Sequence, residues 1–273
     1  TFDFGPILGG MVARTGWNIG KDSPDVVVAM TGGGYHFNNH QHSDAGSFQV
    51  YYHGLQVADL GQYTFYGTPY DTNFNKRSIA HSMMLAFDPG EQFRGGKYLN
   101  DGGTRFGFTT PASEKAVRTN PVHANGTVLS TDFGPDAQEP TFSYFSVDLA
   151  SAYSGKIRNY VRTFCFLNLK NAQAPGALIV VDNMRTSRPD IRKYWQVNTL
   201  DPPRTTRDGL LLGNGESGRN GIVSLRMLRP RPGDRQVEIL SGKDACSVFG
   251  HPLVPPKPNA PQAKGHRVMF SPI

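Results

Sequence analysis

The sequence predicts an all-β protein, a two-layer antiparallel β-sandwich with very little helix. Its 31 Gly and 20 Pro are spread along 273 residues, which indicates many short strands joined by turns. No segment keeps an apolar i, i+3, i+4, i+7 stripe over about 12 residues, as an amphipathic helix would. Hydrophobic residues make up 38% of the chain, enough for the core of one large sandwich.

Strand-like runs follow one another along the whole chain. The run at 25–30 is continuously apolar after its first residue, whereas the run at 47–52 alternates apolar and polar side chains. His53-Gly54 follows it, and such a pair between two runs is typical of a two-residue hairpin turn. The further predicted strands are 55–60, 83–87, 141–149, 157–169, 177–181, 193–197, 210–212, 222–228, 236–240 and 267–270.

The organisation of these runs predicts one sandwich domain over residues 1–273. Residues 1–24 are expected as an N-terminal lead-in to the first strand. The segment 252–265 is rich in Pro, Lys and Ala and is followed by a last strand, so we interpret it as a surface loop rather than a domain boundary. Because the sequence starts at Thr1 without Met, we expect a processed product or a piece of a longer protein.

The charge is +6 with a pI of about 9.3, which suits an anionic partner, although such a charge is also common on ordinary soluble proteins. Basic residues are dispersed except in the run from Arg226 to Arg231, and no nucleic-acid-binding motif is present. No apolar run is long enough to insert into a membrane. Cys165 and Cys246 could form a disulfide or remain two thiols, and the sequence leaves this open.

Histidines gather in one part of the chain. Five of the eight lie between His36 and His81, and two of them form the phrase His40-Gln41-His42 ahead of Asp44. Imidazole and carboxylate ligands in this arrangement suit Zn²⁺ or a similar divalent ion, and a solvated loop is the competing interpretation. Further ligands must come from elsewhere, and Asp59 and His81 are candidates.

An aromatic and polar segment follows the histidine phrase. It contains Tyr63, Tyr66 and Tyr70 and ends near Arg77, with Gly and Pro between them. Aromatic rings can stack on sugars, and phenols can transfer protons, so the segment is a candidate lining of a groove. The alternative is that these tyrosines pack at the edge of the sandwich.

The motifs together resemble the heparinase II/III-like polysaccharide lyases. The phrase from His40 to Phe48 resembles the signature of that family, and 54–61, 63–70 and 77–81 resemble its next elements in order. The segments 160–167, 177–182, 193–195 and 265–272 resemble its sandwich strands, so the resemblance spans roughly residues 25–272. One departure is Ser82, where the family usually has Asn, and it puts the local hydrogen bonding in doubt more than the metal.

The resemblance implies a metal site and a catalytic role for the histidine phrase. It implies that one Zn²⁺, mainly structural, is held by His42, Asp59 and His81, and that His40 takes part in catalysis. We expect Tyr70 as a second catalytic residue, and Tyr63, Tyr66 and Arg77 as substrate-binding residues. The α-helical toroid that supplies the rest of the family's active site is absent from this sequence, so a helical partner chain or domain is expected.

The function implied is β-elimination on an acidic, uronate-containing polysaccharide such as heparin, heparan sulfate or alginate, in a periplasmic or secreted bacterial setting. No nucleic-acid partner is expected. The first alternative is a non-catalytic, zinc-stabilised module that binds polysaccharide or serves in assembly. A cupin-type metal enzyme also contains His-x-His, but Asp44 and His81 fit its pattern poorly.

Overall fold

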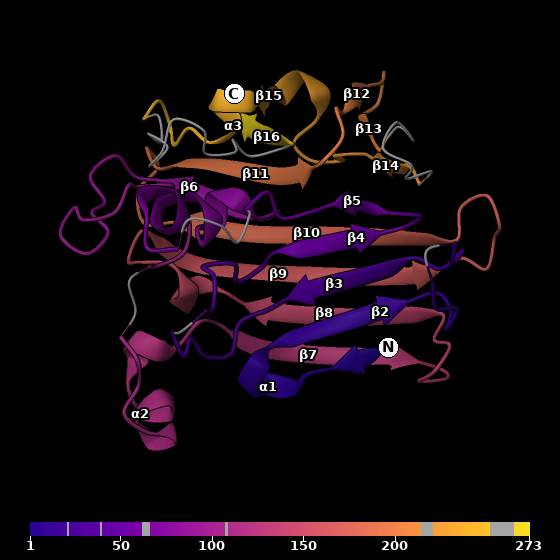
Figure 1. The fold of residues 1–273 in the computed structure, drawn as a ribbon, viewed down its shortest axis with the longest axis horizontal. Coiled ribbons are helices and arrows are strands. Elements are labelled where there is room, and N and C mark those ends of the chain that lie inside the picture. Colours follow the sequence, from indigo (N-terminus) through magenta and orange to yellow (C-terminus); the bar gives the residue numbers. More distant parts are fainter. Residues whose placement is uncertain (21, 39, 62–65, 107–108, 214–220, 252–264) are drawn as a thin grey trace. The chain divides into compact units, whose positions relative to one another are not determined.

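A computed structural model describes the chain except for residues 21, 39, 62–65, 107–108, 214–220 and 252–264 (Figure 1). The described residues form two compact units. Unit 1 consists of 1–41, 45–53 and 107–189, and unit 2 of 42–44, 54–106 and 190–273. Each unit is described by itself.

Unit 1 contains two antiparallel sheets, which lie one in front of the other in Figure 1. The strands of the first sheet that belong to unit 1 are β1 (Phe2–Asp3), β2 (Gly10–Arg14), β3 (Val27–Thr31) and β4 (Phe48–Tyr51). The second has the order β10-β9-β8-β7, with β7 (Thr127–Gly134), β8 (Phe142–Asp148), β9 (Ile157–Asn168) and β10 (Gly176–Thr186). Its helices are short: α1 (Gly5–Leu8), α2 (Glu114–Thr119) and 3-10 turns at Pro121–His123 and Ala150–Ala152.

Alternating side chains join these two sheets into a sandwich. In β9, Phe164 and Phe166 are buried and the residues between and beside them are half-buried. The ring of Phe164 lies 6.1 Å from Phe48 of the first sheet and 6.2 Å from Phe145 of its own sheet. Gly32, directly after β3, lets the layers approach, because a Cβ there would meet the Phe145 ring at 2.5 Å. Unit 1 is therefore a two-layer sandwich with an aromatic interior.

One ion pair is buried within this apolar interior. Arg162 is fully buried, and its Nε and Nη2 donate to the two oxygens of Asp182 at 2.6 and 2.8 Å. The hydroxyl of Tyr160 donates to the same carboxylate at 2.9 Å. Such a bidentate, fully hydrogen-bonded pair satisfies the charges that the sandwich encloses.

Unit 2 also contains antiparallel sheets and short helices. Its larger sheet has the order β15-β16-β11-β6, with β6 (Met84–Phe87), β11 (Arg192–Thr199), β15 (Arg235–Ser241) and β16 (His266–Pro272). Its smaller sheet has the order β12-β13-β14, with β12 (Arg204–Thr205), β13 (Leu210–Leu212) and β14 (Val223–Leu225). The remaining elements are β5 (Leu55–Val57), α3 (Gly242–Ala245), a π-helix (Asp71–Asn75) and 3-10 turns (Ser78–Ala80, Pro232–Asp234).

A compact apolar cluster anchors the loops of unit 2. Tyr70 and Phe74 pack in it with ring centroids 5.6 Å apart. The other buried members are Leu60, Ile79, Ala80, Cys246 and Val248. The cluster joins the π-helix and the turn at Ser78–Ala80 to the segment after α3, and so fixes the chain on both sides of Arg77.

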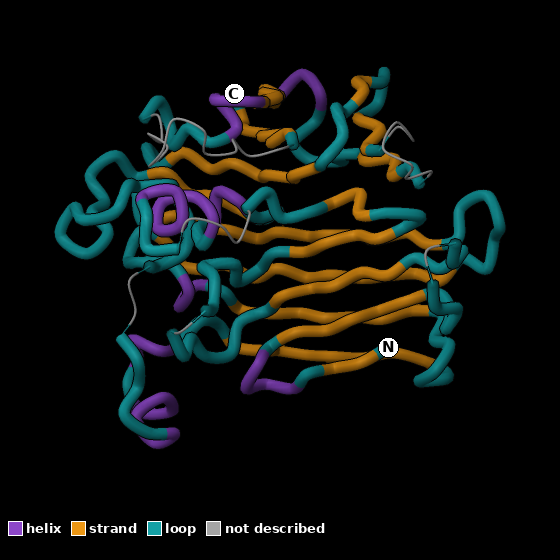
Figure 2. The backbone as a smooth tube through the Cα atoms, viewed as in Figure 1, coloured by secondary structure: helices purple, strands orange, loops and turns teal. Residues whose placement is uncertain are grey.

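The all-β prediction is confirmed: 40% of the residues are in strands and 13% in helices, as the orange and purple segments of Figure 2 show. The twelve predicted strands are present with shifted ends, and His53 and Gly54 have the positive φ values (45° and 124°) of the predicted turn. The prediction missed β1, β2, β7 and β12. The expected lead-in at 1–24 contains β1, α1 and β2, and β2 pairs with β3 along its whole length.

Three further expectations have different outcomes. Most of the predicted loop at 252–265 lies outside the described residues. The prediction of a single domain stays a prediction, because two compact units can belong to one domain. Cys165 and Cys246 are both free thiols, so the open question of a disulfide is answered for this structure.

Within the described chain, each helix is too short or too polar to cross a bilayer.

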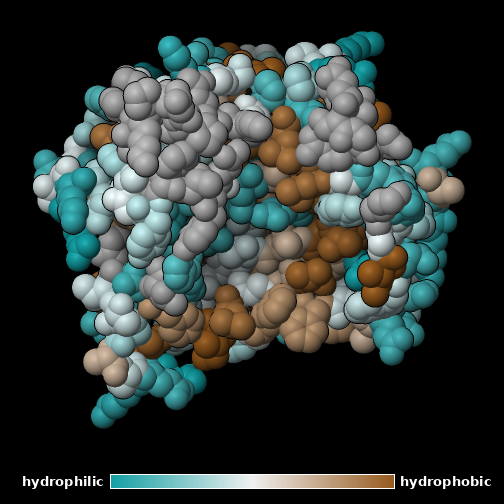
Figure 3. Space-filling model, in the orientation of Figure 1, coloured by the Kyte–Doolittle hydropathy of each residue, from teal (hydrophilic) through white to brown (hydrophobic). Residues whose placement is uncertain are grey.

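A shallow apolar cavity opens on the outer face of β2 and β3, where hydrophobic side chains gather in Figure 3. It has a volume of about 250 Å³ and is lined by Phe4, Leu8, Gly9, Gly10, Met11, Val12, Ala29, Met30 and Thr31. No acid, base or strong nucleophile lines it. The candidate chemistry therefore has to be sought elsewhere.

Candidate functional site

The histidine phrase lies in an irregular segment that ends where β4 begins. Its downstream half is fastened within unit 2 through Ser43, whose N–H donates to the carbonyl of Lys76 at 2.8 Å. The Ser43 hydroxyl donates to the carbonyl of Arg105 at 3.0 Å, and its own carbonyl accepts from the Ser78 hydroxyl at 2.5 Å. Three bonds to distant segments thus fix the residue next to His42.

The side chains of His42, Asp59 and His81 approach one another within unit 2. Nδ1 of His42 lies 3.0 Å from Nε2 of His81, and Oδ2 of Asp59 lies 3.8 Å from the same nitrogen. These residues come from the segment before β4, the segment after β5 and the segment before β6. The His81 side chain is 1% exposed and that of Asp59 30% exposed, so the group is reached from the Asp59 side.

The proton on His81 is fixed by the backbone. Its Nδ1 lies 2.7 Å from the carbonyl oxygen of Arg77. Because a carbonyl oxygen only accepts, Nδ1 must carry a proton, and in the neutral ring Nε2 then presents its lone pair toward His42 and Asp59. An orienting bond of this kind on the remote nitrogen is typical of metal-binding histidines.

Burial also favours the neutral form of His42. Desolvation, with a smaller contribution from neighbouring His81, lowers the pKa of His42 from 6.5 to about 4. The carboxyl group of Asp44 behaves in the opposite sense, because burial raises its pKa from 3.8 to about 6. A neutral imidazole is the form that coordinates metal ions.

The donor types suit a zinc ion, and two of the three donor pairs have comparable spacing. Two ligand atoms of a tetrahedral Zn²⁺ site, each about 2.1 Å from the ion, are ~3.4 Å apart, and the observed 3.0 and 3.8 Å lie on either side of this value. In the part of the chain that the structure describes, however, no three His, Cys, Asp or Glu side chains form a complete metal-binding group. The pairwise distances show convergence of donors, and a bound metal remains a proposal.

His40 lies in unit 1 and is exposed. Of the predicted tyrosines, Tyr63 lies outside the described residues. Tyr66 is 72% exposed, and the ammonium of Lys76 lies 4.5 Å from the centre of its ring. Tyr70 is only 3% exposed and belongs to the apolar cluster, which corresponds to the packing alternative rather than to a catalytic residue.

Arg77 also differs from its expected role. Its side chain is fully buried, and Nη2 donates to Oδ1 of Asp101 at 2.6 Å. Its guanidinium carbon lies 4.5 Å from the ring centre of Phe93 and 4.7 Å from that of Phe106. A guanidinium enclosed by two rings and a carboxylate has no surface to offer a polysaccharide, so the expectation that Arg77 binds substrate does not fit this structure.

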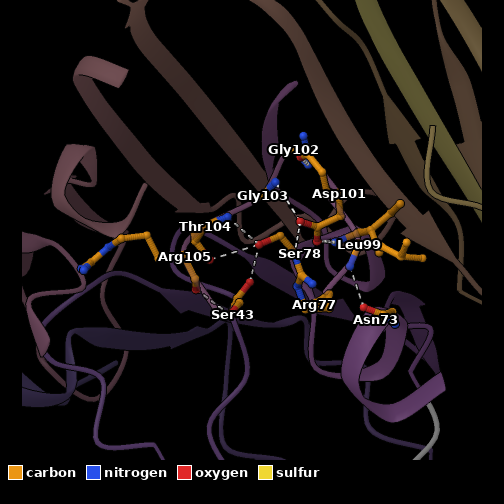
Figure 4. A network of polar contacts seen from close by, with 12 residues as sticks. Ser43, Asn73, Arg77, Ser78, Leu99, Asp101, Gly102, Gly103, Thr104 and Arg105 are labelled. Atoms are coloured by element: carbon orange, nitrogen blue, oxygen red, sulfur yellow. Dashed lines mark hydrogen bonds and ion pairs between the residues drawn. The ribbon is translucent and has the colours of Figure 1, made fainter. Parts of the chain in front are cut away.

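The structure instead makes Arg77 part of a buried network (Figure 4). Asp101 also accepts from the N–H groups of Ile79 and Gly103, at 3.2 and 3.1 Å. The Ser78 hydroxyl lies 2.9 Å from the N–H of Thr104, which donates to it. The network thus ties the turn that carries His81 to the segment around Asp101.

Gln196, a buried residue of β11, was not predicted from the sequence. Its Nε2 donates to the carbonyls of Ile79 and His81 at 2.9 and 2.7 Å, and its Oε1 accepts from Arg267 at 3.0 Å. The Ser82 hydroxyl accepts from the N–H of Asn198 at 3.0 Å, so serine at this position bonds β11 directly. No local pattern marks Gln196, because its partners lie 115 and 117 residues away.

Comparisons with known proteins give a likeness of fold without a likeness of sequence. Two solved structures of heparinase III, one with methylated lysines, match 97% of this chain with TM-scores of 0.52 and 0.50 and identities of 12% and 11%. The chain spans 32% of the length of those heparinase III chains. No family model and no curated protein sequence matches it. The chain therefore has a distant heparinase-like fold.

Proposed function

We propose that this chain is the metal-binding β-sandwich part of a polysaccharide lyase that cleaves an acidic, uronate-containing polysaccharide by β-elimination. The observation that carries the proposal is the convergence of His42, Asp59 and His81 from three separate segments. The heparinase-like fold agrees with this chemistry but does not prove it.

In the proposal, His42, Asp59 and His81 hold one Zn²⁺. The ion would cross-link the three chain segments that carry these residues. A metal-bound water is not needed for a β-elimination. The residues of this chain support it: the Arg77 carbonyl keeps the His81 lone pair directed at the site, and burial keeps His42 neutral. The backbone bond from Ser43 to Lys76 holds the residue next to His42 in unit 2.

His40 is the proposed catalytic residue of this chain. In a β-elimination a base removes the proton at C5 of the uronate, the carboxylate helps to delocalise the developing charge, and an acid protonates the departing glycosidic oxygen. An imidazole can exchange a proton near neutral pH or donate a hydrogen bond to the carboxylate. Among the described tyrosines of this segment, exposed Tyr66 could contact the polysaccharide, whereas buried Tyr70 and Arg77 would act by positioning.

The remaining catalytic groups are proposed to come from a helical partner chain or domain, in a periplasmic or secreted setting. The heparinase III chains are about three times as long as the part matched here, which leaves room for such a partner. The same observation favours the second candidate, a zinc-stabilised module that binds acidic polysaccharide without cleaving it.

The first test is the zinc content of the purified chain, measured by inductively coupled plasma mass spectrometry for the wild type and for His81→Ala. We expect one zinc per chain in the wild type and loss of zinc in the variant. His251→Ala is the matched control, since His251 is an exposed histidine of the same unit. A wild-type chain without zinc after growth in zinc-supplemented medium would reject the metal site.

The second test is the ultraviolet absorbance of unsaturated products on heparin and alginate, with any helical partner that copurifies. Activity that is abolished by His40→Ala while zinc is retained supports the lyase. Retained zinc and binding of polysaccharide without products, in the presence of the partner, would favour the binding module.

A further inference from the structure

Exposed arginines occur on and next to the strands of the small sheet of unit 2. Arg204 of β12 pairs with Leu211 of β13, and Leu211 pairs with Ser224 of β14. Residues directly opposite each other share a face of the sheet, and so do residues two apart along a strand. Arg204 and Ser224 therefore share one face, about 10 Å apart across two strand spacings, and Arg226 follows directly after the end of β14.

The turn between β12 and β13 carries a third arginine. The N–H of Thr206 donates to the carbonyl of Gly209 at 2.9 Å, which closes a tight turn around Arg207. A Cβ at Gly209 would lie 2.0 Å from the Leu225 carbonyl oxygen and 3.3 Å from Cα of Arg226. The turn that carries Arg207 is thus packed directly against the start of the segment after β14.

The chain beyond Arg226 continues this basic surface. Nη1 of Arg235 donates to the carbonyls of Met227 and Pro230, at 2.6 and 2.8 Å, and so holds the loop that carries Arg229 and Arg231. All five arginines, Arg204, Arg207, Arg226, Arg229 and Arg231, are exposed. Within the described chain none of the five forms an ion pair, whereas Arg77 and Arg162 are each bound to a carboxylate.

We propose that these five arginines, the arginine edge, bind a flexible polyanion with repeated carboxylate or sulfate groups, that is, an acidic polysaccharide. Guanidinium groups suit this ligand because each presents a planar pair of donors to an oxyanion. The exposed carboxylates Asp208 and Asp234 offset part of the charge, and the cluster remains net positive.

The composition of the edge favours a polysaccharide over a nucleic acid. Proteins that bind single-stranded nucleic acid combine basic residues with aromatic rings on which bases stack. No Phe, Tyr, Trp or His occurs from residue 204 to 235. The arginine edge therefore has charge without a stacking surface.

The arginine edge shares no residue with the proposed metal site. Its arginines lie after residue 200, whereas His42, Asp59 and His81 all precede residue 82. An edge of this kind would hold the acidic chain without taking part in bond cleavage. A variant that loses zinc and a variant that loses polysaccharide binding at the arginine edge can therefore be told apart.

The test is binding of heparin, polygalacturonate and neutral dextran to the full chain by isothermal titration calorimetry. For the wild type we expect binding of the acidic polymers only, with affinity falling roughly tenfold or more between about 50 and 200 mM salt if three contacts are ionic. Arg204→Ser/Arg207→Ser/Arg226→Ser should weaken this binding at least about tenfold. Arg158→Ser/Arg185→Ser/Arg192→Ser removes the same charge from exposed arginines elsewhere and should change it little.

Each outcome bears on the proposal. Loss of heparin binding alone in the edge variant supports a sulfate ligand, and loss of polygalacturonate binding as well supports any repeated carboxylate. If both triple variants weaken binding equally, the affinity depends only on the net charge of the protein, and the proposed site is rejected. Tighter binding of oligo(dT) than of either acidic polysaccharide, lost in the same edge variant, would overturn the choice of ligand. His81→Ala should leave the binding unchanged, and circular dichroism checks the folding of every variant.

Discussion

The two units bury ion pairs in contrasting surroundings. In unit 1, Arg162 and Asp182 lie in an aromatic sandwich, where Tyr160 donates to the carboxylate and the Phe164 ring lies 5.7 Å from the guanidinium carbon. In unit 2, Arg77 and Asp101 belong to a network that continues to the backbone of the turn just before His81. The first pair completes a core, whereas the second pair supports a candidate site, so a similar chemical interaction serves two different purposes.

The largest expected effect comes from removing one charge of each pair. Asp101→Asn leaves the fully buried guanidinium of Arg77 uncompensated and should cost about 3–5 kcal/mol of unfolding free energy. Asp182→Asn likewise leaves the fully buried guanidinium of Arg162 without its carboxylate and should also cost about 3–5 kcal/mol. Urea denaturation followed by circular dichroism measures both.

Zinc retention then separates the two roles. We expect Asp101→Asn to lower the zinc content and Asp182→Asn to leave it unchanged. Equal zinc contents in the two variants, with both folded, would mean that the network of unit 2 is an ordinary core like that of unit 1.

The second expected effect concerns Gln196→Leu. The substitution removes the donors to the carbonyls of Ile79 and His81 and the acceptor for Arg267, which should cost roughly 2–4 kcal/mol. Gln236→Leu, on the exposed strand β15, is the control and should change the free energy of unfolding by about 0.5 kcal/mol or less. A small effect at Gln196 would show that the turn before β6 does not depend on β11.

The third effect is a dependence on pH in the chelated, metal-free chain. Because the pKa of His42 is about 4 when folded and 6.5 ordinarily, the unfolded chain binds a proton that the folded chain excludes. Stability from this residue is complete above about pH 6.5 and is lost as the pH falls toward 4. The free energy of unfolding of the wild type relative to His42→Gln should therefore rise from pH 4 to 6.5.

Asp44 should give the opposite slope and provides the matched comparison. Its pKa is raised from 3.8 to about 6 on folding, so the folded chain holds a proton that the unfolded chain releases. The wild type relative to Asp44→Asn should lose stability as the pH rises from about 4 to 6. Two difference curves of the same sign would contradict the assigned burial of one of these groups.

The smallest effect is expected on the outer face of unit 1. Val181 of β10 is 56% exposed, so Val181→Thr should change the unfolding free energy by about 0.5 kcal/mol or less. Val147 of β8 is fully buried, and Val147→Thr should cost ~1–3 kcal/mol because its hydroxyl enters an apolar layer. Similar costs for the two would mean that the outer face of β10 is covered in solution.

Much of the fold could be predicted because alternation and turn residues are local signals. The strand around Val50 and the long strand containing Phe164 and Phe166 follow directly from their patterns. By contrast, β2 was missed because its five residues include Gly10 and Arg14 and give little periodic signal. The order of strands within each sheet depends on pairings that no single segment contains.

Only those residues of the candidate site that belong to a sequence motif could be predicted. His42, Asp59 and His81 were predicted through the family resemblance, and the structure brings their donor atoms within 3.8 Å of His81. Gln196 and Asp101 carry no motif and act over long sequence separations. Arg77 was assigned to substrate because a basic side chain can attract an acidic polysaccharide. Its enclosure by Phe93 and Phe106 depends on the folding of the whole segment.

The bond between Nδ1 of His81 and the carbonyl of Arg77 has a consequence for how such a site can be studied. The turn at Ser78–Ala80 places that carbonyl four residues upstream of the imidazole, and the buried guanidinium of the same residue holds the turn in place. The acceptor that selects the tautomer is therefore a backbone atom, common to all twenty amino acids. An alanine scan would pass over it, and only a change to the peptide group itself, such as an ester at the 77–78 bond, would reveal what it contributes.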